Sequence, residues 1–294
     1  MKEVISIDLG ATNLRVGLVK EDLSTPKVLR ERTTKNDKEL LYSQIKRMMT
    51  ELLTSEVYKT SKPKVIGVSA CGIVNNNHIE CLPNLGITDF DLKERLEKDF
   101  KNFKVYISND ANTTAFAEAT YGMAKEFDTS FFITISSGIG GCLVYNHELI
   151  DLPFEIGHLP IRYKEKFYES EKLLSGNGIV ELAKLNGLDV ESASMLFSLV
   201  QDKDTLALKV YDEWIKYLGS LISSLHLMFG VDVFILSGGV MKSSDIFMDD
   251  LKEVSSAFTI PYLKKPIIFK HSKFDQDAGL MGGASIALKT LNRV

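Results

Sequence analysis

Residues 4–20 read VISIDLGATNLRVGLVK, in which two apolar runs rich in β-branched residues flank a turn at Gly10. This pattern predicts two strands joined by a tight connection. Residues 130–145, SFFITISSGIGGCLVY, repeat the plan around a second glycine-rich turn. Two such hairpins, one in each half of the chain, indicate a duplicated architecture.

The rest of the sequence alternates between helical and strand-like patterns. Helices are expected over residues 37–59, 92–100, 112–124, 190–200 and 205–229, after Ser175 and at the end of the chain, and further strands over 64–69, 104–108, 231–236 and 267–270. This alternation predicts an α/β fold, and 294 residues suffice for two domains. We place a small N-terminal α/β domain at residues 1–110, joined by the last helix at 278–294, and a large C-terminal α/β domain at 111–277.

The composition excludes several classes of protein. The 35 basic and 39 acidic residues give a net charge of −4, so the chain lacks the basic surplus needed to bind nucleic acid through its phosphates. Cys71, Cys81 and Cys142 are too widely spaced to predict a disulfide framework, which favours a reducing, cytoplasmic location. No apolar run approaches the roughly 20 residues of a membrane helix. The strand pattern begins at about residue 3, so we expect no secretory signal.

Three glycine-rich turns follow apolar strands and are candidate phosphate sites. They are residues 8–13 (DLGATN), 136–141 (SSGIGG) and 237–239 (SGG). Glycine lets backbone N–H groups approach a phosphate closely, although tight hairpins also use it for steric reasons alone. Asp8 and Thr12 could in addition orient a magnesium ion and donate to a phosphate oxygen. None of the turns is a Walker A loop, because no Gly-Lys-Ser/Thr follows.

Asn109 and Asp110 end a predicted strand and precede a predicted helix. Proteins of the α/β class place reactive groups at such positions. An aspartate before a helix is also an ordinary N-terminal cap. The local pattern alone leaves both interpretations open.

Taken in order, these motifs resemble the sugar kinases of the actin-like ATPase superfamily, which also includes hexokinase, actin and heat-shock chaperones. IDLGATN, ISNDANTTAFAEA, ISSGIGG, EIGH, LSGG and DAGLMGGA match the ROK family and the bacterial glucokinases, over residues 4 to about 288. The resemblance implies a two-domain actin-like ATPase (ribonuclease H-like) fold with an interdomain cleft. It also implies ATP-dependent phosphorylation of a hexose, with ATP lying across the first two glycine-rich turns.

The resemblance also implies individual roles. Asp110 would be the catalytic base that accepts the proton of the attacking sugar hydroxyl. The sugar would be bound by Asn84, Asn109, Asp110, Glu155, His158 and Glu171. The nucleotide would be bound by Asp8, Gly10, Thr12, Asn13, Ser137, Gly138, Gly140, Gly238 and Gly239, with Mg²⁺ held through water at Asp8. Gly282 and Gly283 could touch nucleotide or simply permit close helix packing.

One departure from the family pattern concerns zinc. Typical ROK kinases follow the Gly157-His158 dipeptide with a cysteine-rich zinc loop, whereas residues 159–171 contain no cysteine. We therefore expect no structural zinc and a sugar site held by packing. The other histidines match no motif and are expected to be structural; they are His78, His147, His226 and His271.

The substrate and the class of protein have alternatives. Glu171 within EKLLSG favours glucose, but kinases of N-acetylmannosamine, N-acetylglucosamine and fructose share most of these motifs. Sugar-responsive repressors of the same family carry a helix-turn-helix ahead of the kinase-like fold, which we do not expect because the first strand starts at about residue 3. A non-enzymatic actin-like ATPase would not need the Asn109-Asp110, EIGH and Glu171 constellation. Family members commonly form homodimers, which leaves the oligomeric state open.

Overall fold

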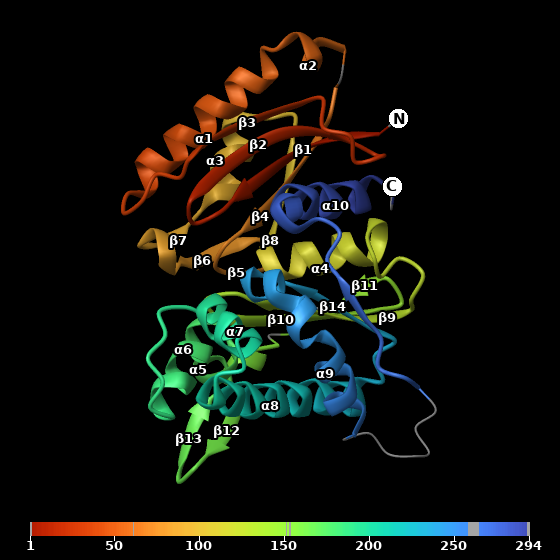
Figure 1. The fold of residues 1–294 in the computed structure, drawn as a ribbon. Coiled ribbons are helices and arrows are strands. Elements are labelled where there is room, and N and C mark those ends of the chain that lie inside the picture. The colour runs from red at the N-terminus through yellow and green to blue at the C-terminus, as the bar shows by residue number, and fades with distance from the viewer. Residues whose placement is uncertain (1, 61, 151, 153, 258–264, 293–294) are drawn as a thin grey trace. The chain divides into compact units, whose positions relative to one another are not determined.

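The computed structural model describes residues 2–60, 62–150, 152, 154–257 and 265–292. The chain divides into two compact units, Met1–Thr120 with Gln276–Val294, and Tyr121–Asp275. Each unit contains a five-stranded sheet that begins with one of the two predicted hairpins, and helices pack against both sheets (Figure 1). The predicted α/β class is therefore confirmed. Residues 293 and 294 of the expected last helix lie outside the described residues.

The sheet of the first unit has the strand order β3-β2-β1-β4-β8. Strands β1, β4 and β8 are parallel, whereas β2 and β3 are antiparallel to their neighbours. The strands are β1 (Glu3–Leu9), β2 (Asn13–Lys20), β3 (Lys27–Arg32), β4 (Val65–Ala70) and β8 (Lys104–Asn109). The helices are α1 (Lys38–Leu53), α2 (Glu56–Thr60), α3 (Leu92–Asp99), α4 (Asp110–Tyr121) and α10 (Ala278–Asn292). A smaller sheet comprises β5 (Ile73–Asn75), β6 (His78–Leu82) and β7 (Ile87–Phe90).

The expectation of one continuous helix over residues 37–59 is wrong, because that segment contains both α1 and α2. Thr54 ends the first helix, and its hydroxyl donates a hydrogen bond to the carbonyl of Thr50. The hydroxyl of Ser55 donates to the carbonyl of Leu52 in the same way. Such side-chain bonds compete with the backbone ladder and end the helix.

Helix α10 packs closely on β1 and β4, and on β4 the two backbones come into direct contact. A Cβ added to Gly67 on β4 would lie 1.9 Å from the carbonyl oxygen of Gly283, and one added to Gly283 would lie 2.5 Å from Oγ of Ser6 on β1. A Cβ on Gly282 would meet the side chain of Thr113 on α4 at 2.6 Å. The packing role proposed for the paired glycines is therefore sufficient to explain them.

Side chains occupy backbone donors on β8, the last strand of this sheet. The N–H of Val105 donates to Glu97 on α3 at 3.0 Å, and the N–H of Ile107 donates to Asn77 at 2.9 Å. An edge strand with free N–H groups can recruit another strand. These two side chains block part of that edge.

The sheet of the second unit has the order β11-β10-β9-β14-β15. Its strands are β9 (Thr129–Ile135), β10 (Ile139–Tyr145), β11 (Glu148–Leu149), β14 (Val233–Ser237) and β15 (Phe269–His271). Its helices are α5 (Glu171–Leu174), α6 (Gly176–Leu185), α7 (Ala193–Gln201), α8 (Thr205–Phe229) and α9 (Ser244–Ala257). A separate antiparallel hairpin is formed by β12 (Pro160–Tyr163) and β13 (Lys166–Glu169), neither of which was predicted.

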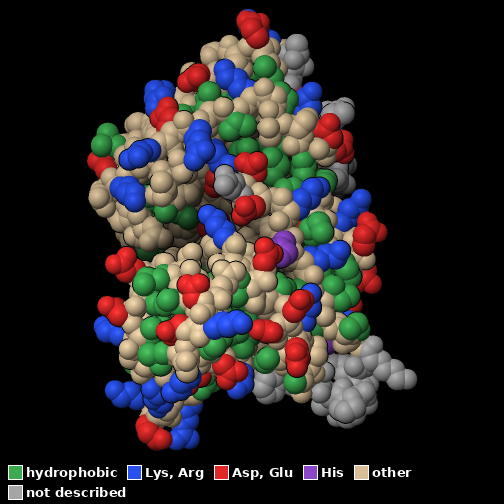
Figure 2. Space-filling model, viewed as in Figure 1, with side chains coloured by type: hydrophobic (Ala, Val, Ile, Leu, Met, Phe, Trp, Pro, Cys, Tyr) green, Lys and Arg blue, Asp and Glu red, His purple; other side chains and the backbone are tan. Residues whose placement is uncertain are grey.

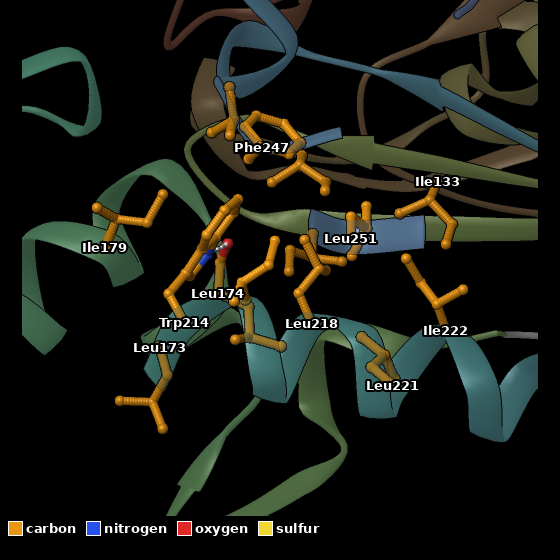
Figure 3. Packing of buried hydrophobic residues seen from close by; sticks show 14 of the residues in the cluster. Ile133, Leu173, Leu174, Ile179, Trp214, Leu218, Leu221, Ile222, Phe247 and Leu251 are labelled. Atoms are coloured by element: carbon orange, nitrogen blue, oxygen red, sulfur yellow. Dashed lines mark hydrogen bonds between the residues drawn. The ribbon is translucent and has the colours of Figure 1, made fainter. Parts of the chain in front are cut away.

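Helix α8 forms the centre of the core of this unit. It begins at a cap in which Asp204 accepts hydrogen bonds from two backbone N–H groups, and it ends at Gly230 in the left-handed conformation. Figure 3 shows its apolar face, including Trp214 and Leu218, pointing toward Phe247 and Leu251 of α9. The indole N–H of Trp214 is not left unpaired, because it donates to the carbonyl of Leu174 at 3.0 Å (Figure 3).

The β12–β13 hairpin is anchored to the helices of its unit through Tyr163. The phenol O–H donates to Glu213 on α8 at 2.7 Å and accepts from Asn186, which follows α6, at 2.6 Å. The ring of Tyr163 also contacts those of Tyr168 and Tyr217 edge-on. This hairpin lies within residues 159–171, the segment that contains no cysteine.

Acidic and basic side chains are interspersed over the face seen in Figure 2, and hydrophobic side chains appear there mostly in small groups. Across the described residues, no helix combines the length and the apolar character that crossing a membrane requires.

Candidate active site

Three parallel strands of the first unit end at one edge of the sheet and bring several candidate residues together. The register pairs Asp8 with Ser69, and Ser69 with Ser108, so the carboxyl ends of β1, β4 and β8 are level. Asp8, Cys71 and Asp110 therefore lie at the same edge. Burial is the main reason that the pKa of the Cys71 thiol is raised to about 12, and the negative charges of Asp110 and Asp8 add to the rise.

Asp110 has the properties expected of a general base. Asp110 is exposed on one side, but the protein atoms around its carboxylate remove part of the solvation of the charged form, and this raises its pKa to about 6. The charge of Asp8 raises it further, whereas the N–H of Ala111, which donates to Oδ1 at 2.9 Å, opposes the shift. Among the described residues, no other residue donates a hydrogen bond to Oδ2. That oxygen is available to accept a proton from a ligand.

The N-terminal cap considered for Asp110 is supplied instead by Asn109. Its Oδ1 accepts from the N–H of Ala111 at 2.8 Å, and its Nδ2 donates to the carbonyl of Gly72 at 2.7 Å. One Nδ2 hydrogen remains for a ligand. Because Asn109 makes these contacts, Asp110 is not needed to begin the helix.

Gly72 also connects this edge to Asn84. A Cβ on Gly72 would lie 2.1 Å from the carbonyl oxygen of Cys81, so β6 passes directly against it. Asn84 follows β6 in a single 3-10 turn, Pro83–Leu85, and is exposed. The strand that leads to this predicted sugar contact is thus packed against Gly72, to which Asn109 is also bonded.

Asp8 is paired with a residue that the sequence analysis did not identify. Oδ2 of Asp8 accepts from Nε and Nη2 of Arg15, both at 2.7 Å, and both side chains are only 14% exposed. Arg15 also reaches the exposed Asp277 at 2.8 Å. Burial raises the pKa of Asp8, and the guanidinium opposes that rise. A Cβ on Gly279 would lie 2.1 Å from Oδ1, so only glycine fits there.

The DLGATN turn is closed by its own backbone. The N–H of Gly10 donates to the carbonyl of Asn13 at 3.1 Å, and the hydroxyl of Thr33 donates to the carbonyl of Gly10 at 2.7 Å. Thr12 lies exposed at the tip. The side chain of Asn13 accepts from Arg30 at 3.3 Å. These bonds hold the turn closed and leave Thr12 exposed to solvent.

In the second unit, the SSGIGG turn lies against Glu171. A Cβ on Gly138 would lie 2.8 Å from Oε2 of Glu171, and one on Gly157 would lie 3.5 Å from the same oxygen. Both glycines therefore leave room for this carboxylate. A cavity of about 650 Å³ opens beside it, lined by Ser137, Gly138, Tyr168, Glu171, Lys172, Ser175, Asn177, Gly178 and Glu181. Lys172, which the sequence analysis did not single out, lies 3.2 Å from Oε1 of Glu171.

The EIGH motif forms a short 3-10 turn at the base of the β12–β13 hairpin. Nε2 of His158 lies 3.9 Å from Oε2 of Glu155, and Nδ1 lies 3.2 Å from Oε1 of Glu169. Both members of the predicted pair are largely exposed, at 55% for His158 and 72% for Glu155. A ligand can therefore reach them.

A second cavity of the same unit, of about 380 Å³, fits the predicted nucleotide motifs. Its lining includes Ser137 from the SSGIGG turn, and Gly239 and Lys242 after β14. A Cβ on Gly239 would meet no atom within 4 Å. Gly238 differs, because its φ is +101° and a Cβ there would lie 2.3 Å from the carbonyl of Ile135. Gly238 allows the strands to approach, and Gly239 lines the open space. Gly140 belongs to β10, and a Cβ there would lie 3.3 Å from Thr134.

The metal expectations remain predictions. Within the described ranges, no cluster of three or more His, Cys, Asp or Glu side chains could hold a metal ion. Since Oδ2 of Asp8 is engaged by Arg15, only Oδ1 remains for a magnesium-bound water. Mg²⁺ keeps several waters and uses few carboxylates, so this single oxygen fits the indirect contact that the sequence suggested.

The comparisons with known proteins agree with these motifs. The chain matches the model of the ROK family over residues 4–290. It is 28% identical to a glucokinase of Halalkalibacterium halodurans, covering 74% of each chain. It is 26% identical to an N-acetyl-D-glucosamine kinase of Histophilus somni, covering 96% of this chain and 97% of the relative. It is 25% identical to a xylose repressor of Bacillus spizizenii, of which it covers 62%.

A solved structure gives the same result for the fold. The ROK family glucokinase from Streptomyces griseus, in complex with glucose and AMPPNP, superposes with a TM-score of 0.73 at 20% identity, covering 98% of this chain and 99% of that one. This likeness confirms the predicted actin-like ATPase class of fold.

Proposed function

Because the chain belongs to the ROK family, we propose that it transfers the γ-phosphoryl group of ATP to a hexose, with glucose as the preferred sugar. The observation that carries this proposal is Asp110, whose raised pKa of about 6 and whose Oδ2, to which no other described residue donates, suit a general base that works near neutral pH. The alternative role of Asp110 as the N-terminal cap of the helix is weakened, since Asn109 already caps that helix.

The proposed step is an in-line displacement. Oδ2 of Asp110 accepts the proton of the primary hydroxyl of the sugar. The sugar oxygen then forms a bond to the γ-phosphorus, the bond from that phosphorus to the bridging oxygen breaks, and ADP leaves. Asp110 positions the sugar hydroxyl and accepts its proton. The proton transfer contributes most when the pKa of this base lies close to the working pH.

The remaining residues bind the two substrates. Glu155, His158 and Glu171 would accept and donate hydrogen bonds to sugar hydroxyls, and Asn84 and Asn109 would add amide contacts. The SSGIGG turn and Gly239 would bind the nucleotide through backbone N–H groups. Asp8 would orient the hydrated Mg²⁺ that shields the phosphates.

Glucose is proposed as the substrate on the strength of Glu171. Its carboxylate lies beside Gly138 of the phosphate turn, so one residue would couple sugar binding to the correct placement of the phosphate. The relative that phosphorylates N-acetyl-D-glucosamine supports an amino sugar as the second candidate. An acetamido group would need additional room beside the sugar 2-position.

A coupled assay of ADP release with ATP and Mg²⁺ tests the proposal. Glucose, mannose, fructose, N-acetylglucosamine and N-acetylmannosamine would be compared at equal concentrations. We expect the highest kcat/KM for glucose, and loss of turnover for all sugars in Asp110→Asn. Preference for an acetamido sugar would change the substrate but keep the mechanism. Sugar binding without ADP release in the native protein would instead favour a sugar-responsive regulator, as the xylose repressor relative suggests.

A further inference from the structure

The base of the β12–β13 hairpin places a third carboxylate beside the EIGH motif. Oε1 of Glu169 lies 3.2 Å from Nδ1 of His158, whereas Glu155 approaches the other ring nitrogen, Nε2. No sequence motif marks Glu169. It reaches His158 only because the hairpin turns the chain back on itself.

Glu169 is held in place by the hairpin. Strand pairing sets Glu169 opposite Pro160, two residues after His158. The next residue, Ser170, is buried; its N–H donates to the carbonyl of Leu159 at 2.8 Å, and its hydroxyl donates to the carbonyl of Ile156. The two chain segments are therefore fixed to each other on both sides of the contact.

A carboxylate at this distance decides where a neutral imidazole carries its proton. A lone pair on Nδ1 would face the negative oxygen of Glu169 and be repelled, whereas an N–H there is attracted. Glu155 acts on Nε2 in the same way but from 3.9 Å rather than 3.2 Å, so the closer Glu169 favours the proton on Nδ1 and the lone pair on Nε2. Neutral histidine in water prefers the opposite tautomer, with the proton on Nε2, so Glu169 reverses the intrinsic preference.

We propose that Glu169 is a positioning residue that fixes His158 as the Nδ1–H tautomer, so that Nε2 accepts a hydrogen bond from a sugar hydroxyl. This inference rests on the proposed function. Nε2 and Oε2 of Glu155 are 3.9 Å apart, and both are then acceptors. Two acceptors at this spacing match two neighbouring hydroxyls of a sugar ring, each of which donates one proton. An acyclic alcohol with a single hydroxyl would use only one of them.

Glu169 would thereby take over the bracing of His158 in a segment without the cysteines of the typical zinc loop. Tyr163 ties the same hairpin to α8 through Glu213. In this arrangement, helix α8 holds the hairpin through the Tyr163–Glu213 hydrogen bond, and the hairpin places Glu169 beside His158.

The tautomer can be measured directly by long-range ¹⁵N–¹H correlation NMR of ¹⁵N-histidine-labelled protein at pH 8.5. His158 would be assigned from the signal missing in His158→Gln. We expect the Nδ1–H pattern in the native protein and a shift to the Nε2–H pattern in Glu169→Ala. An Nε2–H pattern in the native protein would overturn the proposal. This measurement does not depend on turnover, so it separates failure of the inference from failure of the proposed kinase activity.

Kinetics provide the second readout. Glu169→Ala is expected to raise the sugar KM about 5- to 10-fold, the effect of one lost hydrogen bond, while kcat and the ATP KM stay within about twofold. Glu169→Gln keeps an oxygen that accepts the Nδ1 proton and should restore most of the loss. Glu165→Ala, at the tip of the same hairpin and 91% exposed, is the matched control and should change nothing. An unchanged sugar KM in folded Glu169→Ala, or an equal rise in the control, would contradict the assignment.

Discussion

Asp8 and Arg15 face each other across the first hairpin, and the guanidinium of Arg15 lies 2.7 Å from Oδ2 of Asp8. The two side chains are each only 14% exposed. The pair therefore replaces much of the solvation that burial removes from Asp8, and it does so at the sheet edge that carries Asp110. Without Arg15, two carboxylates would share this edge with no buried counter-charge.

Removing this counter-charge should destabilise the fold. Arg15→Met is expected to lower the free energy of unfolding by about 2–4 kcal/mol, because it leaves a mostly buried carboxylate unpaired. Asp8→Asn combined with Arg15→Met should recover most of that loss. Urea denaturation measures both. Lys216→Met, which removes the partner of Asp212 in a pair exposed by about 60%, is the control, and its expected effect is about 0–1 kcal/mol. An equal effect in the control would show that burial of the Asp8 pair is unimportant.

Asp110 should set the acidic limb of the pH–rate profile. Because its pKa is raised from 3.8 to about 6, the base is lost as pH falls through 6. We expect kcat/KM to fall tenfold per pH unit below that value, and Asp110→Asn to lose at least about 100-fold in kcat. A profile that stays flat down to pH 5 would exclude Asp110 as the base whose ionisation controls the rate.

The raised pKa of Asp110 also means that its carboxylate lowers the stability of the fold at neutral pH. The native state binds this proton more tightly than the unfolded chain, so the contribution of Asp110 to stability is unfavourable above pH 6 and is relieved as pH falls from about 6 toward 4. Asp110→Asn should therefore raise the free energy of unfolding at pH 7.5. The gain should be about 1 kcal/mol, since solvent reaches the residue and screens the charge. Thermal unfolding at pH 7.5 and pH 4.5 measures it, and the gain should be smaller at the lower pH.

The contact between Gly138 and Glu171 predicts a selective defect. In Gly138→Ala, the new Cβ would lie 2.8 Å from Oε2 of Glu171 and push the carboxylate away. We expect the sugar KM to rise about tenfold, the equivalent of one lost hydrogen bond to a charged group. Gly239→Ala adds its Cβ to open space and is the matched control, with an unchanged sugar KM expected. Equal sugar KM values in the two variants would contradict this role for Glu171.

Gly67 tests the interpretation of the paired glycines as packing residues. Gly67→Ala would place a Cβ 1.9 Å from the backbone of Gly283, which cannot move without shifting α10. We expect a loss of about 3 kcal/mol or more in the free energy of unfolding, at the upper end of the range for overpacking. The matched control is Gly239→Ala, whose stability should be nearly unchanged. Calorimetry in the absence of nucleotide separates this effect from any change in ATP binding.

The sequence predicted the parts of the fold that depend on local pattern. The two hairpins, the 25-residue helix Thr205–Phe229 and the position of Asp110 at the end of a strand all follow from apolar periodicity and glycine placement. Arg15 could have been found as well. Once the turn at Gly10 is fixed, the antiparallel register places Arg15 directly opposite Asp8.

Other features depend on contacts between distant residues and have no local signal. Strands β12 and β13 are four residues each, too short for alternation to distinguish them from loop. Without that hairpin, nothing relates Glu169 to His158. Gly238 is required for close packing and Gly239 is not, because Gly238 lies against the backbone of Ile135, about a hundred residues earlier in the chain.

The packing of α10 on β1 and β4 has a consequence for the synthesis of the protein. Residues 121–275 form a compact unit from one continuous stretch of chain, so they can fold as soon as they leave the ribosome. The sheet that carries Asp8 and Asn109 is translated before this unit, yet its Gly67 surface stays uncovered until Gly283 has emerged. Residues 1–120 thus reach their native environment only after residues 121–275 have been made, and the nascent chain must keep that face from aggregating in the meantime.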